Sequence, residues 1–167
     1  MPLEEQQVTV FAVPPIGFDG ELPDWVRPVD EPTMLHAWWN LASTAETVVS
    51  FNGRGFDVPF LLGRSLVHQI PARVDLLGNR YALRPHLDLH RAIAGGERLP
   101  GPANLDVLCW ALGIESPKEQ MDGSMVAPAY AQGEIVKIAT YNAHDVRATS
   151  AVYQKVRDGS LRFRDNW

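Results

Sequence analysis

The amino-acid sequence predicts an α/β domain, on the strength of three observations. β-branched apolar runs occur early in the chain, helical patterns follow them, and Pro- and Gly-rich turns separate the two kinds of segment. An opening of alternating strands and helices favours a layered α/β domain over an all-helical one. The length of 167 residues suits a single domain, which we expect to span residues 1–167.

The first half of the chain supplies the predicted strands. Val8–Val13 is β-branched and apolar and is ended by two prolines, and a short strand is expected near residues 25–29. Asp30 is predicted to cap a helix that has a proline in its first turn. The apolar residues at helical spacing in this helix are Met34, Leu35, Trp38, Leu41 and Ala42.

A buried strand and a second helix are expected next. Thr47–Phe51 reads as the strand, and residues 56–68 read as the helix, with Asp57 and Pro59 in its first turn. Residues 71–101 contain only short irregular pieces.

Helices dominate the second half. Asn104 is predicted to cap a helix over 105–112 that stops at Gly113. Further helices are expected around 127–132 and from 134 to 157. The last helix carries a stripe along one face: Ile138, Tyr141, Asp145, Ala148 and Val152.

Charge and composition limit the classes of function. A net charge of −5 argues against a broad basic surface for duplex nucleic acid, but it allows a cleft that grips a few nucleotides. The single cysteine, Cys109, lies in an apolar run, which predicts a buried thiol in a reducing compartment. With no signal-peptide pattern and no long apolar span, we expect a cytoplasmic protein without a membrane partner.

Two carboxylates are placed where they suggest metal chemistry. Asp57 follows a strand and a glycine-rich turn, and Tyr141 and Asp145 are four residues apart on one helix face. Two remote carboxylates are part of what a divalent-metal site for phosphodiester cleavage needs, although a full site needs more. Each also has an ordinary alternative: Asp57 complementing a helix dipole, and Tyr141 as a core residue beside a surface aspartate.

The segments 51–61 and 141–145 resemble the second and third motifs of the DEDD exonuclease superfamily, the third in its tyrosine subtype. The histidine subtype would carry its histidine at position 140, where Thr140 stands. With segments 84–89, 104–114 and 118–126, the chain resembles predicted 3′–5′ exonucleases related to the proofreading domain of family-B DNA polymerases. The resemblance extends from about residue 8 to residue 156.

This resemblance implies a ribonuclease H-like fold, with a mixed sheet flanked by helices, and two Mg²⁺ or Mn²⁺ ions roughly 3.5–4 Å apart. It implies a metal-dependent 3′–5′ exonuclease acting on the 3′ ends of single-stranded DNA, with RNA left open. Asp57 and Asp145 match metal-binding aspartates and Tyr141 matches the catalytic tyrosine. The substrate contacts are expected from Asn52, Phe56 and Lys118.

The family's first motif, Asp-x-Glu on the first strand, is not found in its place. Asp19-Gly20-Glu21 matches literally, but it lies in a Gly- and Pro-rich stretch that favours a hairpin loop. Three accounts remain. The chain is a fragment or a mis-started reading of a longer enzyme and so lacks the family's first strand, it uses another acidic residue such as Asp19 or Glu21, or it no longer cleaves. The last account makes it a non-catalytic nucleic-acid-binding or interaction module.

Several other polar and aromatic residues have structural interpretations. Asp88 is expected to hydrogen-bond local backbone, and His86 and His90 are expected to be structural because the metal chemistry above prefers oxygen ligands. Trp38 is expected in the core and Trp39 over a surface, although the pair could also stack on bases. A small-molecule hydrolase built on a histidine has little support, because no serine or cysteine nucleophile motif accompanies it.

Overall fold

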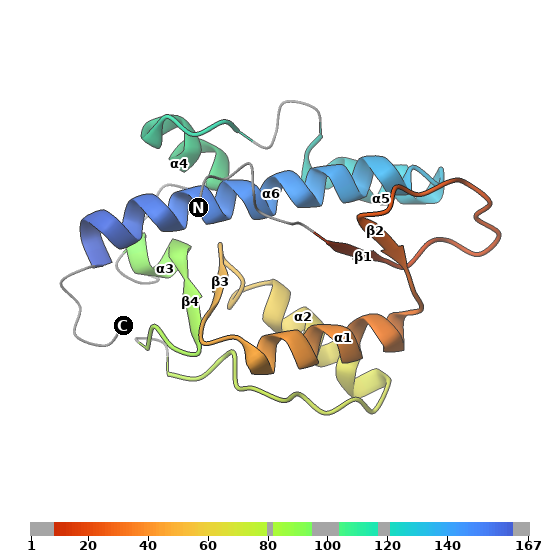
Figure 1. Ribbon diagram of the computed structural model, residues 1–167, viewed down its shortest axis with the longest axis horizontal. Coiled ribbons are helices and arrows are strands. Elements are labelled where there is room, and N and C mark those ends of the chain that lie inside the picture. Colours follow the sequence, from red (N-terminus) through yellow and green to blue (C-terminus); the bar gives the residue numbers. More distant parts are fainter. Residues whose placement is uncertain (1–8, 80–81, 95–103, 117–120, 162–167) are drawn as a thin grey trace.

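The computed structural model describes residues 9–79, 82–94, 104–116 and 121–161. Its elements in chain order are β1 (Val10–Ala12), β2 (Val26–Pro28), α1 (Glu31–Thr44), β3 (Val48–Ser50), α2 (Asp57–Val67), β4 (His86–Asp88), α3 (Leu89–Ala94), α4 (Leu105–Leu112), the 3-10 turn η3 (Gly123–Met125), α5 (Val126–Ala131), α6 (Ile135–Val156) and the π turn η4 (Arg157–Leu161). Figure 1 shows α6 running along the length of the molecule above the strands. The expected α/β class is confirmed.

The described strands form two parallel pairs rather than one mixed sheet. β1 pairs with β2, and β3 pairs with β4, with Val48 opposite His86 and Ser50 opposite Asp88. Because β1 and β2 run parallel, the 13–25 connection is a crossover, and the expected hairpin loop is wrong. The parallel arrangement of β3 and β4 brings their carboxyl ends to the same edge.

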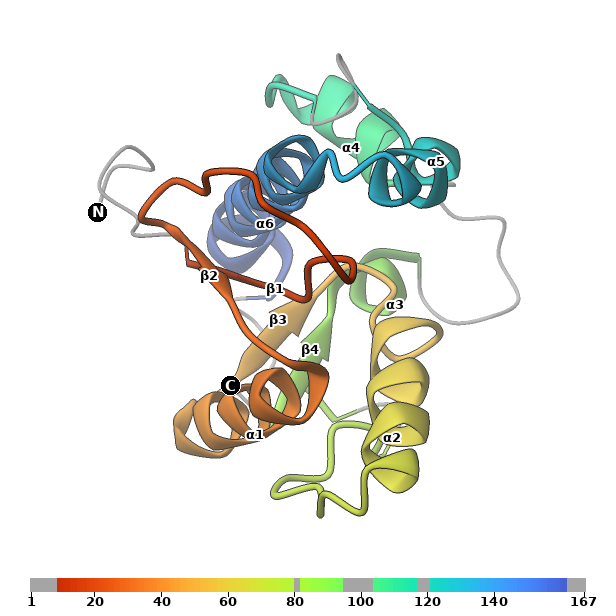
Figure 2. The same ribbon diagram turned by 90° about the vertical axis from the view of Figure 1, so that its right-hand side faces the viewer.

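The β3–β4 pair separates two layers of helices. Figure 2 shows α1 and α2 on one side of these strands and α6 on the other. Successive strand residues point to opposite faces, so Val48 packs toward α1 and α2 while Val49 packs toward α6. The two hydrophobic clusters therefore meet at this sheet, and they hold it between the helices.

The apolar stripe predicted for α1 faces the core only in part. Leu35, Trp39 and Ala42 are buried, whereas Leu41 is 62% exposed. Trp38 is only half-buried beside this cluster, so the predicted places of Trp38 and Trp39 are the wrong way round. Helix α1 carries apolar residues on more than one face. Packing against α2 decides which of them are buried.

Trp39 links α1 to α2. Its indole nitrogen Nε1 donates a 2.8 Å hydrogen bond to Ser65 Oγ, and both side chains are buried. A ring enclosed in this way is not available to stack on a base, so the expected role of the tryptophan pair as a stacking platform is wrong for Trp39. The Trp39 ring instead fixes the spacing of the two helices beneath β3.

The helix ends follow the predictions closely. The Asp30 carboxylate accepts a 2.8 Å hydrogen bond from the Thr33 amide, and Asn104 Oδ1 accepts a 2.9 Å bond from the Val107 amide. Gly113 ends α4 with a φ of 66°, a left-handed conformation that suits glycine. Cys109 is fully buried beneath α6, as expected.

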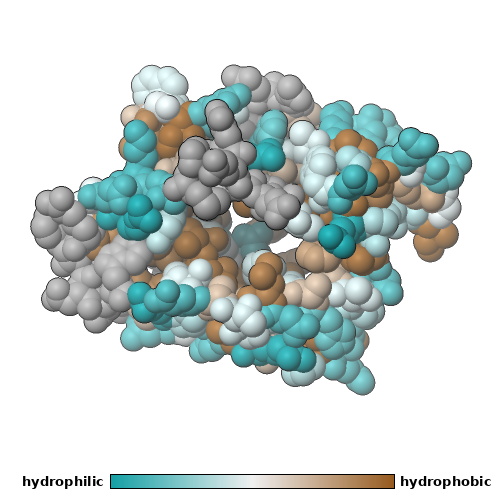
Figure 3. Space-filling model, in the orientation of Figure 1, coloured by the Kyte–Doolittle hydropathy of each residue, from teal (hydrophilic) through white to brown (hydrophobic). Residues whose placement is uncertain are grey.

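The surface and the helix lengths carry two further observations. On the face in Figure 3, apolar and polar residues are interspersed, and a hollow lies near the middle of the molecule. Among the described residues, no helix combines the length and the apolar character needed to cross a bilayer.

Candidate functional site

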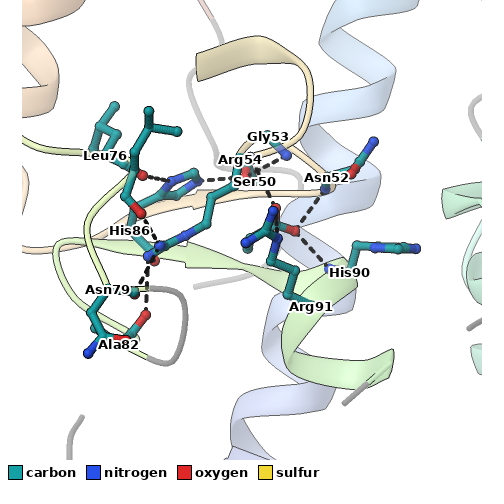
Figure 4. Close-up of polar contacts among 12 residues, drawn as sticks. Ser50, Asn52, Gly53, Arg54, Leu76, Asn79, Ala82, His86, His90 and Arg91 are labelled. Atoms are coloured by element: carbon teal, nitrogen blue, oxygen red, sulfur yellow. Dashed lines mark hydrogen bonds and ion pairs between the residues drawn. The ribbon is translucent and has the colours of Figure 1, made fainter. Parts of the chain in front are cut away.

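The turn that follows β3 is built around one residue in a left-handed conformation. Asn52 has a φ of 61°, which asparagine tolerates better than most residues, and its carbonyl accepts hydrogen bonds from the amides of Gly55 and Phe56. A Cβ added at Gly53 would lie 2.3 Å from Ser50 Oγ, so only glycine fits there. This Asn-Gly turn, seen in Figure 4, is followed by α2, which begins at Asp57.

The carboxylate of Asp88 holds this turn in place. Its Oδ1 accepts hydrogen bonds from the amides of Asn52, at 2.9 Å, and His90, at 3.1 Å, and its Oδ2 accepts one from the Arg54 amide at 3.1 Å. Arg91 Nε lies 4.0 Å from Oδ2. Asp88 is only 3% exposed, and the prediction of a structural aspartate is confirmed.

Arg54 anchors the same turn from its side chain. Arg54 is 5% exposed, and within the described part of the chain its guanidinium donates to backbone carbonyls. Nη1 binds the carbonyls of Leu77 and of Asn79, and Nη2 binds those of Ala82, at 3.2 Å, and His86, at 2.7 Å. The loop between α2 and β4 is thereby tied to the β3 turn, as Figure 4 shows. Sequence reasoning missed this role, because an arginine between two glycines gives no local sign of burial.

His86 takes part in a second buried chain of hydrogen bonds. Its Nδ1 lies 2.7 Å from the Leu76 carbonyl and therefore donates, which leaves Nε2 to accept from Ser50 Oγ at 2.7 Å. Burial lowers the pKa of His86, which keeps the ring neutral in this arrangement. Because the ring is fully buried, the structural interpretation of His86 is supported.

Asp57 begins α2 at the carboxyl edge of the β3–β4 pair. Its side chain is exposed, yet the surrounding protein desolvates the carboxylate enough to raise its pKa, and the charge of Asp88 raises it further. A hydrogen bond from its own backbone amide and the nearby His86 act in the opposite direction. Asp57 therefore lies within electrostatic reach of the Asp88 carboxylate at the sheet edge.

Tyr141 and Asp145 interact on α6, as their four-residue spacing predicts. Both side chains are half-buried. Burial raises the pKa of Tyr141, and the charge of Asp145 and a side-chain hydrogen bond to it raise the pKa further. The phenol therefore stays protonated at neutral pH and can donate a hydrogen bond. Burial is the largest cause of the raised pKa of Cys109, and the charges of Asp106 and Asp145 raise it further.

A cavity of about 560 Å³ lies beside Tyr141. Its walls combine the β1–β2 connection, through Phe18 and Glu21, with the amino-terminal half of α6. Met121, 3% exposed, contributes to its lining. Glu21, the last residue of the literal Asp-x-Glu match, is therefore an exposed carboxylate in the wall of the Tyr141 cavity.

A family model matches residues 21–165, and its description is a predicted 3′–5′ exonuclease related to the exonuclease domain of PolB. The chain belongs to this family of PolB-related exonucleases. Family membership supports a nuclease function and a nucleic-acid substrate in general terms. No curated protein matches the chain.

In this member of the family, the predicted site residues fall into two groups. Asp57 is within electrostatic reach of Asp88 and His86, and Asp145 is within electrostatic reach of Tyr141 and Cys109. Among the described residues, no three histidine, cysteine, aspartate or glutamate side chains are placed to share a metal ion.

The predicted substrate contacts are differently placed. Asn52 has a clear role in the backbone of the turn, through its left-handed φ and its carbonyl. Phe56 is 70% exposed directly before α2, where its ring is accessible to a ligand. Lys118 lies outside the described residues.

Proposed function

We propose that this chain is a metal-dependent 3′–5′ exonuclease domain of ribonuclease H-like fold that spans residues 1–167 and acts on single-stranded nucleic acid ends. The observation that carries the proposal is the family match over 21–165, together with the tyrosine–aspartate pair of the third motif interacting on α6. Hydrolysis would release nucleotides one at a time from the 3′ end of DNA, with RNA as the second substrate to test.

The β3 turn supports a role for Asp57. Three amides around the turn and the β4–α3 junction donate hydrogen bonds to Asp88. The Arg54 guanidinium in turn donates a hydrogen bond to the His86 carbonyl on β4. A side chain on such a fixed backbone keeps its direction without further ordering, which favours ligand binding at that point. Asp57 is also exposed, so a ligand can reach it.

Tyr141 supports the proposal through its protonation state. Its raised pKa keeps the phenol a hydrogen-bond donor, and Asp145 holds it from one turn further along α6. Its single hydrogen is directed to Asp145, so the lone pairs of the phenol oxygen, beside a 560 Å³ cavity, are suited to accepting from and orienting a water molecule. We propose this positioning as its part in cleavage.

The family implies Mg²⁺ or Mn²⁺, which in such enzymes would lower the pKa of a bound water and neutralise phosphate charge. The described residues do not by themselves complete a site for it, since they hold no group of three suitable side chains. Asp57 and Asp145 are the ligands that we propose. Two carboxylates alone suit the demand of Mg²⁺ for octahedral oxygen coordination poorly.

That incomplete ligand set favours a second candidate function, a nucleic-acid-binding module of the same fold that does not cleave. It predicts that the chain binds single strands equally well with and without a divalent ion. It also predicts that the parent releases no nucleotides, so that replacement of Asp57 or Asp145 leaves the assay for nucleotide release unchanged.

The test is the Asp145→Asn variant, assayed for nucleotide release from a single strand in Mn²⁺. We expect cleavage to be abolished while thermal unfolding is little changed, because asparagine keeps the size of the side chain. Asp24→Asn, at an exposed position of the β1–β2 connection, is the matched control and should cleave like the parent. Unchanged turnover in Asp145→Asn would overturn the proposal.

A further inference from the structure

We propose that the carboxyl-terminal half of α6, facing the segment after α4, is a track for the single strand that leads to the cleaved end. A cavity of about 870 Å³ lies there, between residues 113–116 and α6. This inference rests on the proposed function for the identity of its occupant, single-stranded nucleic acid. Its two tested residues, Arg147 and Lys155, lie outside the exonuclease motifs.

Two cavities along α6 share one lining residue. His144 lines both the 560 Å³ cavity beside Tyr141 and the 870 Å³ cavity further along the helix. Its exposed ring lies three residues from Tyr141 on α6. The second cavity therefore lies next along α6 from the place where the proposed function puts the end of the strand.

The residues of α6 that line the second cavity form one helical face. They recur every three or four residues and comprise His144, Arg147, Ala148, Ala151, Gln154 and Lys155. From Tyr141 to Lys155 the helix rises about 21 Å at 1.5 Å per residue. Stacked nucleotides are spaced about 3.4 Å apart along one strand, so this face is long enough for several of them.

The charges along this face suit a phosphate chain. Arg147 and Lys155 are both exposed, and among the described residues neither forms an ion pair. Asp158, at the far end of the cavity, is paired with Arg157 at 2.9 Å. Glu115 is the remaining carboxylate of the lining. The two unpaired cations thus lie eight residues apart on one face of an otherwise acidic protein.

The small side chains between the cations leave room for a ligand. Ala148 and Ala151, which are largely buried, line the cavity floor, and Ile114 adds an apolar wall. Bases contact apolar surface while phosphates contact cations, so a floor of alanines flanked by Arg147 and Lys155 suits a single strand.

Binding is measured without cleavage, by fluorescence anisotropy in EDTA with labelled dT and U strands of about twelve nucleotides. We compare the parent with an Arg147→Glu/Lys155→Glu variant and with the control Arg27→Glu/Arg73→Glu, which reverses two exposed charges elsewhere. We expect the track variant to bind at least about tenfold more weakly. The slope of log K against log salt should fall by about 1.4, since each single-strand phosphate contact contributes about 0.7. Circular dichroism and thermal unfolding establish that both variants fold.

The outcomes separate this inference from the proposed nuclease activity. Equal binding by the parent and the track variant would overturn the inference, as would an equal loss in the control or no binding of either strand by the parent. A track variant that loses binding supports the inference even if the parent does not cleave, in which case only the nuclease proposal fails. Where the parent does cleave, the track variant should show a raised KM on the long strand and an unchanged rate on a dinucleotide.

Discussion

The carboxylate of Asp88 accepts a 2.9 Å hydrogen bond from the backbone amide of Asn52, which lies 36 residues earlier in the sequence. The same carboxylate accepts a hydrogen bond from the Arg54 amide. The residue at the carboxyl end of β4 therefore positions the chain that leaves β3. Asp57 follows this turn as the first residue of α2. The position of a proposed metal ligand thus depends on a buried aspartate that is hydrogen-bonded to three backbone amides.

Replacement of Asp88 by alanine should lower the free energy of unfolding by about 3 kcal/mol, because three amides lose their acceptor and a buried unsatisfied group costs about 1–3 kcal/mol. Urea unfolding measures the change. Asp24→Ala, at an exposed position, should shift stability by less than about 0.5 kcal/mol. Equal midpoints for the Asp88 variant and the parent would contradict the role assigned to this carboxylate.

Arg54→Lys should destabilise the protein by about 2 kcal/mol, because an ammonium group cannot reach both pairs of carbonyls that the planar guanidinium binds. The charge is kept, so the loss reports geometry. Arg27→Lys, exposed on β2, is the control and should leave the unfolding midpoint unchanged. A lysine variant as stable as the parent would show that the carbonyl contacts contribute little.

Ser65→Ala should cost about 1–2 kcal/mol, because it leaves the buried Trp39 Nε1–H without an acceptor. The Trp39→Phe variant removes the donor instead, and the double variant completes a thermodynamic cycle. We expect the serine replacement to cost less in the phenylalanine background than in the parent. Additive losses of unfolding free energy in the cycle would mean that Trp39 and Ser65 do not stabilise the protein through their hydrogen bond.

Glu31 gives the protein a pH dependence of stability in acid. Its pairing with Arg64, at 2.5 Å, and with His68, at 2.8 Å, lowers the pKa of Glu31 to about 2. A depressed carboxyl pKa contributes stability that is present above the unfolded pKa of 4.5 and is lost as pH falls toward 2. Because the pair is partly exposed, the contribution is modest.

The measurement is the difference in Tm between the parent and Glu31→Gln as a function of pH. The parent should be more stable near neutral pH, and the two curves should converge between about pH 4.5 and 2. A constant difference over that range would contradict the assignment.

The sequence predicts the parts of this structure that depend on local chemistry. The caps at Asp30 and Asn104 and the glycine stop at Gly113 need only neighbouring backbone, and all three are confirmed. The spacing of Tyr141 and Asp145 likewise sets their contact within one helix.

Long-range packing accounts for what the sequence did not predict. The buried face of α1 depends on α2, which selects Trp39 over Trp38 as the enclosed ring. The buried guanidinium of Arg54 binds carbonyls 23 to 32 residues away, and no local pattern marks those partners. The parallel pairing of β1 and β2 was missed for the same reason, because strand order is not encoded in periodicity.

The central claim is tested most directly with a single strand labelled at its 3′ end and the same strand labelled at its 5′ end, each incubated with the chain in Mn²⁺. The account predicts immediate loss of the 3′ label as mononucleotide and a ladder of shortening 5′-labelled products, both absent in Asp57→Ala. Intact strands with the folded parent chain, or cleavage that persists in Asp57→Ala, would contradict it.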